Sequence, residues 1–283
     1  MEDALDLLGW LGIGLKLSLY VTSLLASGMA LTVISGVVEA DRARLWLMPA
    51  AWLSLSATFI AGLRVCLSSM QMGDMTMLAM VWDMQHQSVL ATGAGFIAMS
   101  LAIIAPDWMQ RGLALSGALA LSLSFGLTGH TQALESPAFF PLLVAGHVLI
   151  AAFWFSAPLV LWPQHSLSDE GVLARTERFG NIALYAVPLL FIGGGVLAWK
   201  LGGGFSGLTT STYGIALGAK LTAATAALGL GALNKLRVAS VLKTSPDHGR
   251  LELKRTLCAD AVLFMLALLA ITLATTLFGP PMA

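Results

Sequence analysis

Charged residues are scarce in this 283-residue chain. Lys, Arg, Asp and Glu make up 11% of it, whereas a soluble globular domain carries about a quarter. Hydrophobic residues account for 57%, and the mean hydropathy is +0.83. A soluble fold could not cover this much apolar surface, so the composition excludes that class and predicts an integral membrane protein.

Several functional signatures are also missing. The 15 basic and 15 acidic residues cancel, so net charge gives no support for a nucleic-acid partner. The two cysteines, Cys66 and Cys258, are expected at opposite ends of the membrane, which excludes a disulfide between them. There is no P-loop, no nucleotide-binding glycine pattern behind a strand, and no CxxC or HExxH. We therefore expect no enzyme activity and no ATP-driven transport by this chain alone.

Long apolar segments are the dominant feature of the sequence. A membrane-spanning helix needs about 20 predominantly apolar residues. Segments of this kind lie at 7–36, 46–67, 87–105, 112–131, 139–162, 180–200, 212–234 and 257–278. The connectors between them are too short for a separate soluble domain. The sequence therefore predicts an all-α polytopic bundle of eight spans, forming a single integral membrane domain over residues 1–283.

The basic residues predict the orientation of these spans, because an excess of Lys and Arg stays on the cytoplasmic side. The connectors after the first, third, fifth and seventh spans hold eleven of the 15 basic residues. They are Arg42, Arg44, Arg111, Arg175, Arg178, Lys235, Arg237, Lys243, Arg250, Lys254 and Arg255. Both termini are therefore expected on the outer side, together with the connector between the second and third spans.

That outer connector, residues 69–86, is rich in methionine. It contains six of the 13 methionines: Met70, Met72, Met75, Met77, Met80 and Met84. Thioether sulfur is a soft ligand that favours Cu(I) over hard cations. If the stretch from Asp74 is helical, Met77, Met80 and Met84 share one face.

Methionine also serves as a flexible hydrophobe, and here it could fill the underside of an interfacial helix anchored by Trp82. The density of methionines, the outer position and the neighbouring Asp74 and His86 favour a copper-binding surface that includes His86.

Two histidines fall inside predicted spans. His130 ends the fourth span and His147 lies about two turns into the fifth, so both belong to the outer half of an antiparallel helix pair. Neutral imidazole is a good copper ligand, although either histidine could equally be a packed, hydrogen-bonded residue. His165 and His248 lie in cytoplasmic connectors and are expected to be solvated.

Ionisable residues within spans are costly and therefore functional candidates. Lys16, Arg64 and Lys220 fall in the outer half, where they could extend to the headgroups or pair with an acid. The acids available to them are Asp74, Asp83 and Glu135.

Toward the cytoplasm, Asn234 and Asp260 could form an inner polar station, or Asp260 could pair with Arg178 or Lys235. Glycines are expected to allow close helix packing, namely Gly193, Gly194, Gly195, Gly218, Gly229 and Gly231.

Several motifs in the second half resemble a known family. They are Arg178-Phe179-Gly180, Gly193 to Ala198, Tyr213 to Leu221, Gly231 to Arg237 and Leu253 to Thr276, preceded by Thr128-Gly129-His130 and by His147 with Trp154. In order and spacing they resemble the CopD/PcoD copper resistance membrane proteins. Gly180, Lys235 and Asp260 depart from the family pattern, which usually has Ser, Arg and Glu there.

The resemblance implies an eight-helix protein of the bacterial inner membrane that moves copper between periplasm and cytoplasm, often with a periplasmic copper-binding partner. In this hypothesis the methionine segment and His86 capture copper, as Cu(I) in preference to Cu(II), and His130 and His147 form a site among the helices. The alternative is a membrane haem protein that transfers electrons, with His130 and His147 as axial ligands and Lys220 or Arg64 at the propionates. A metal sensor or docking platform without flux is a third possibility.

Overall fold

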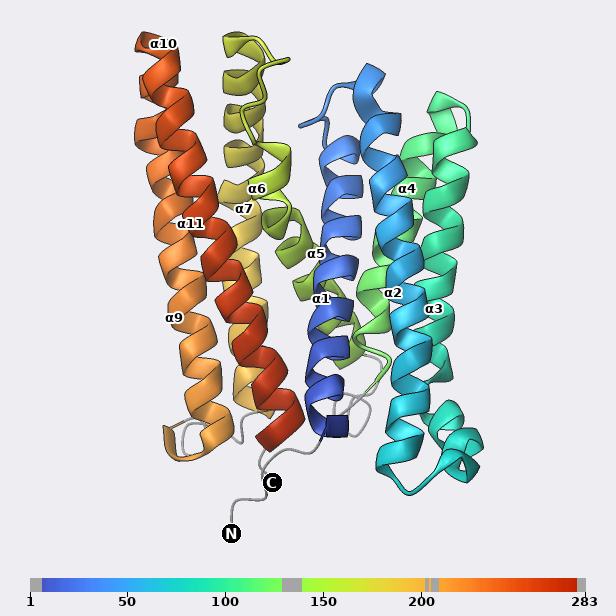
Figure 1. Cartoon of the computed structure of the whole chain (residues 1–283). Coiled ribbons are helices and arrows are strands. Elements are labelled where there is room, and N and C mark those ends of the chain that lie inside the picture. Colours follow the sequence, from blue (N-terminus) through green and yellow to red (C-terminus); the bar gives the residue numbers. More distant parts are fainter. Residues whose placement is uncertain (1–6, 129–138, 202–203, 205–208, 279–283) are drawn as a thin grey trace.

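The computed structural model describes residues 7–128, 139–201, 204 and 209–278, and this part of the chain is helical without strands (Figure 1). The α-helices are α1 (Leu7–Ile34), α2 (Ala43–Gln71), α3 (Leu78–Ile104), α4 (Asp107–Ser124), α5 (Phe139–Phe155), α6 (Ala157–Val160), α7 (Asp169–Leu201), α9 (Thr212–Leu233), α10 (Ala239–Thr244) and α11 (Pro246–Leu273). Two 3-10 turns, η1 (Ala40–Arg42) and η2 (Met75–Met77), and two π-helical turns, η4 (Asn234–Val238) and η5 (Ala274–Phe278), adjoin them.

Seven helices in the described residues are long and apolar enough to cross a membrane. They run over Leu7–Ile34, Ala40–Gln71, Met75–Ile104, Phe139–Val160, Asp169–Lys200, Thr212–Thr244 and Pro246–Leu277. The chain is therefore a multi-pass membrane protein, as its composition predicts. Most helices extend beyond the predicted spans because polar residues at the membrane surface continue the helical backbone.

The remaining predicted span, 112–131, corresponds to α4. This helix ends at Ser124, and its 18 residues include Asp107, Gln110 and Arg111 in the first turns, which lower its mean hydropathy. It nevertheless packs against α1, α3 and α5 within the bundle. Counting α4 as an eighth span remains a prediction.

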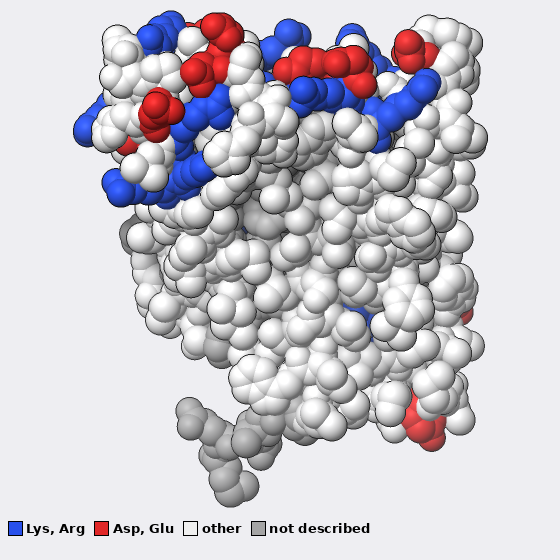
Figure 2. Space-filling view, turned by 45° about the horizontal axis from the view of Figure 1, so that its top comes forward, with Lys and Arg blue, Asp and Glu red and all other residues white. Residues whose placement is uncertain are grey.

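The helices lie side by side along one common direction (Figure 1). Helix α1 lies between two groups, with α2, α3 and α4 on one side and α7, α9 and α11 on the other. On one side α1 packs against α2, α4 and α5, and on the other it touches α11, which forms a close pair with α9. Helix α1 begins and η5 ends at the same end of the bundle, while α6 and α10 lie toward the opposite end. Lys, Arg, Asp and Glu gather at that opposite end, called here the charged end (Figure 2).

Close helix contacts use glycines, but mostly not those expected from the sequence. A Cβ on Gly95 would meet Leu121 at 2.7 Å, and one on Gly117 would meet Met99 at 2.9 Å. Of the predicted packing glycines, Gly193 and Gly194 do face a neighbouring helix. The prediction was wrong for four others, which have open space where a Cβ would lie: Gly195, Gly218, Gly229 and Gly231. A glycine run shows only that close approach is allowed, and the neighbouring helix decides which member is used.

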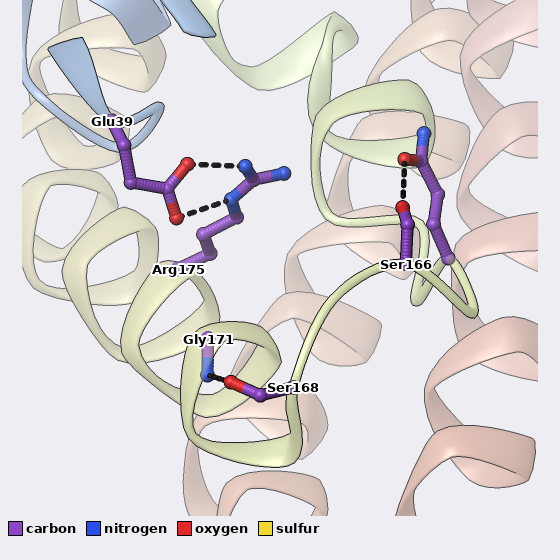
Figure 3. A network of polar contacts seen from close by, with 6 residues as sticks. Glu39, Ser166, Ser168, Gly171 and Arg175 are labelled. Carbon is purple, nitrogen blue, oxygen red and sulfur yellow. Dashed lines mark hydrogen bonds and ion pairs between the residues drawn. The ribbon is translucent and has the colours of Figure 1, made fainter. Parts of the chain in front are cut away.

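At the charged end, α7 is bonded to the loop that follows α1. Arg175 forms an ion pair with Glu39 in the loop after α1, with its Nε 3.3 Å from Oε1 (Figure 3). Arg178 donates from Nε to the Ser35 carbonyl at 2.9 Å. Gly36, with φ +68°, lies so close to Arg178 that a Cβ would meet Nη2 at 2.7 Å. Burial raises the pKa of Glu39, but the hydrogen bond and charge of Arg175 outweigh it and leave that pKa below its usual value.

Candidate functional site

The methionine segment occupies the turn between α2 and α3, at the end of the bundle opposite the charged end (Figure 1). Met70 and Met72 close α2, Met75 and Met77 lie in η2, and Met80 and Met84 begin α3. All six side chains are exposed, with relative accessibilities from 36% to 54%. The protein therefore leaves a large part of each methionine side chain uncovered, where a ligand can reach it.

The predicted helical face is present in this segment. Residues from Met75 onward are helical, so Met77, Met80 and Met84 follow the i, i+3, i+7 spacing of one face. Asp74 starts the helix: its carboxylate accepts hydrogen bonds from the Thr76 N–H at 2.7 Å and from the Thr76 hydroxyl at 2.5 Å. These bonds, the hydroxyl first, lower the pKa of Asp74. The Asp74 carboxylate therefore carries a negative charge at neutral pH, and it lies next to the methionines in the chain.

His86 lies on the other side of α3 from these methionines. A helix turns by about 100° per residue, and His86 lies two positions after Met84. The His86 side chain therefore leaves α3 nearly opposite Met84. Its Nδ1 is 3.0 Å from the Asp83 carbonyl and 3.2 Å from the Trp82 carbonyl. A carbonyl only accepts, so Nδ1 carries the proton and Nε2 keeps a free lone pair. The helix therefore does not bring His86 together with the Met77, Met80 and Met84 face.

His147, on α5, is half-buried against α7. Its Nδ1 donates to the Leu190 carbonyl at 3.1 Å, which again leaves Nε2 with its lone pair. A Cβ on Gly194 would meet the ring Cε1 at 2.9 Å, so only glycine leaves room for the imidazole in this position. Fixing one ring nitrogen on a carbonyl so that the other can bind a metal is the usual arrangement around a histidine ligand.

Three basic side chains lie in the half of the bundle that is away from the charged end. Lys220, on α9, is within electrostatic range of His147 and is half-buried. Among the described residues Lys16 has no acidic partner within 4.0 Å, and its Nζ donates to the Thr275 carbonyl at 3.1 Å, which links α1 to η5. Arg64, on α2, is within electrostatic range of Lys16 and Tyr20.

Other predicted site residues fall outside the described part of the chain. His130 and Glu135 belong to residues 129–138, so the expected pairing of His130 with His147 stays a prediction. Among the described residues, no group of three or more His, Cys, Asp and Glu side chains could hold a metal ion.

His165 and His248 are exposed, as expected, and His248 lies 3.3 Å from Glu252. Cys66 and Cys258 are both free thiols.

The inner polar residues are buried and partly unpaired. Asn234 opens the π-helical turn η4, and its Oδ1 accepts a hydrogen bond from the Thr256 hydroxyl at 2.5 Å. Asp260, on α11, is 2% exposed, and its Oδ1 has no hydrogen-bond partner in the described structure. The alternative pairing of Asp260 with Arg178 or Lys235 was wrong. Arg178 binds Ser35, while Lys235 donates to Asn181 Oδ1 at 3.2 Å and to the Gly180 carbonyl at 3.4 Å.

A comparison with protein families gives a match in the second half of the chain. Residues 173–274 match the CopD family model, copper resistance protein D. The resemblance seen in the sequence is thereby confirmed for this segment, called here the CopD region, which covers most of α7 and all of α9, η4 and α10, and continues through α11. No curated protein and no solved structure matches the sequence.

The CopD region supplies the surroundings of the candidate ligands rather than the ligands themselves. It contains the Leu190 carbonyl, Gly194, Lys220, Asn234 and Asp260. His147 and the methionine segment precede it. The contact that sequence reasoning missed is the Leu190 carbonyl, because a backbone group carries no residue-type signal.

Proposed function

We propose that this protein transports copper across the bacterial inner membrane in copper homeostasis or resistance. One observation carries the proposal: the CopD region holds the His147 imidazole by the Leu190 carbonyl and seats it against Gly194, which leaves Nε2 as a ligand atom inside the bundle. The family match associates this region with copper resistance. Copper is then the cargo of the protein and not a resident cofactor.

The exposed methionines are the proposed capture surface. Sulfur ligands and a nearby carboxylate suit Cu(I), because the thioethers recognise the soft ion and the Asp74 charge attracts any cation. In the proposed orientation this surface faces the periplasm, where a periplasmic copper-binding protein could hand over its ion. His86, on the opposite side of α3, would act as a separate ligand.

Lys220 supports release rather than binding. An ammonium near His147 repels a copper ion bound to Nε2 and so weakens the site. A transport site must bind its ion well enough to admit it and weakly enough to release it. Lys220 therefore would keep His147 from becoming a storage site.

Copper uptake into proteoliposomes of known orientation tests this function directly. We expect the intact protein to move Cu(I), and the His147→Ala variant to lose most of the flux while remaining folded. His165→Ala is the matched control, because His165 is exposed and lies in the loop before α7. Equal flux with and without the protein would rule out transport.

Metal content and the visible spectrum of the purified protein separate the remaining possibilities. Copper bound at His147 without flux would favour a sensor or a docking platform. A Soret band that disappears in His147→Ala would favour haem coordination instead.

A further inference from the structure

A row of polar side chains on α11 leads from the charged end into the membrane. Glu252, Thr256 and Asp260 follow one another at four-residue spacing, so they lie on one side of the helix. The row covers about 12 Å along the helix axis. At its inner end Asp260 is 2% exposed, and at its outer end the Glu252 side chain is 17% exposed.

Each end of this row has an oxygen without a hydrogen-bond partner in the described structure, namely Glu252 Oε2 and Asp260 Oδ1. Between them the Thr256 hydroxyl lies 2.5 Å from Asn234 Oδ1. Asn234 opens a π-helical turn, a local widening of a helix that is frequent at functional sites. At the surface, Glu252 Oε1 is 3.4 Å from Arg237 and 3.3 Å from His248.

Within the described ranges, no basic group forms an ion pair with Asp260. The helices and turns packed against α11 are α1, α6, α9, η4, α10 and η5. Their charged or titratable side chains are Lys16, Tyr20, Tyr213, Lys220, Lys235, Arg237 and Lys243. In the described part of the chain none of these lies within 4.0 Å of an Asp260 carboxylate oxygen. Lys16, Lys235, Arg237 and Lys243 are already engaged by other groups.

We propose that Asp260 is a proton-binding site of the membrane interior, and that Glu252, Thr256 and Asn234 connect it to the charged end. A buried carboxylate without a counter-ion is costly in a membrane, and the neutral acid avoids that cost. Asp, Glu and His side chains that follow one another within a membrane protein form proton relays in pumps and transporters. His248, whose Nε2 is 3.3 Å from Glu252 Oε1, lies at the charged end of the row.

This site stands independently of the copper proposal. Infrared spectroscopy of the purified protein in lipid nanodiscs detects it, because a protonated carboxyl has a C=O stretch that a carboxylate lacks. We expect such a band in the intact protein and its loss in Asp260→Asn. A spectrum that Asp260→Asn leaves unchanged in this region overturns the proposal. If Asp260→Asn fails to fold, Asp260→Glu replaces it: the band must shift, and a band that does not move overturns the assignment.

Hydrogen–deuterium exchange of the same band tests the connection. Thr256→Val and Glu252→Gln should each slow the exchange severalfold, because they remove a hydroxyl or an acid from the row. Thr222→Val and Glu170→Gln are the matched controls, since Thr222 bonds only within its own helix and Glu170 is exposed. Equal exchange rates in all four variants would overturn the path.

Discussion

Arg175 of α7 and Glu39 of the loop after α1 form an ion pair in which only one partner reaches water. The Arg175 side chain is 4% exposed, whereas the Glu39 side chain is 44% exposed. The pair joins the CopD region to the first half of the chain, at the end of the bundle where most charges gather (Figures 2 and 3).

This asymmetry predicts unequal costs for removing the two partners. Glu39→Gln leaves a buried guanidinium without its counter-ion and should destabilise the protein by about 3 kcal/mol. Arg175→Met leaves a carboxylate that water can solvate and should cost less, about 1 kcal/mol. Thermal unfolding in detergent measures both. The opposite order would contradict the exposed fractions of the two side chains.

The same pair predicts a dependence of stability on pH. The pKa of Glu39 is lowered in the folded protein, so its contribution is complete above the usual glutamate pKa and is lost as pH falls through the lowered value. The melting temperature should therefore drop more steeply on acidification in the intact protein than in Glu39→Gln. Parallel curves for the two proteins would show that Glu39 does not carry this effect.

Gly194 and Gly195 form a matched pair for testing the contact that positions the His147 ring. In Gly194→Ala the new methyl would meet Cε1 of His147 at 2.9 Å and must displace the ring, whereas Gly195 faces open space. Both changes raise helix propensity equally. We expect Gly194→Ala to weaken copper binding roughly 10- to 100-fold, as loss of a positioning contact does, and Gly195→Ala to leave it unchanged. Isothermal titration with Cu(I) in a competing chelator gives both affinities, and equal values would separate His147 from copper binding.

Methionines on and off the proposed capture surface provide another comparison. A triple leucine variant of Met77, Met80 and Met84 keeps the helix and its apolar character but removes three sulfurs, so copper binding at this surface should fall. The control is the triple leucine variant of Met48, Met109 and Met265, which are also exposed. Copper stoichiometry by elemental analysis distinguishes them. The same loss in both variants would mean that methionine acts only as a hydrophobe.

Lys220→Gln tests whether the ammonium keeps the inner site weak. Removing the charge near His147 should tighten copper binding and slow copper release from proteoliposomes, because the repulsion disappears. Lys200→Gln is the control, since Lys200 lies at the end of α7 and is exposed. Weaker binding in Lys220→Gln would instead make Lys220 a structural residue of the site.

The sequence by itself determined the class of the protein and the distribution of its charges. Apolar segments of membrane-spanning length predict helices because the backbone must satisfy its own hydrogen bonds in lipid. The methionine spacing likewise predicts a helical face, because the 3.6-residue period is local. The motifs of the second half were enough to indicate the resemblance to CopD, which the family match confirms for residues 173–274.

Only the tertiary structure decided which groups meet. The Leu190 carbonyl that orients His147 lies 43 residues away in the chain, and no residue type marks it. The partners of Arg178 and Lys235 are backbone and amide groups rather than Asp260, because helix rotation and not sequence spacing sets which side chains face each other. The same rotation leaves Asp260 buried without an ion pair, and it selects Gly194 over Gly195 as the glycine that touches the imidazole.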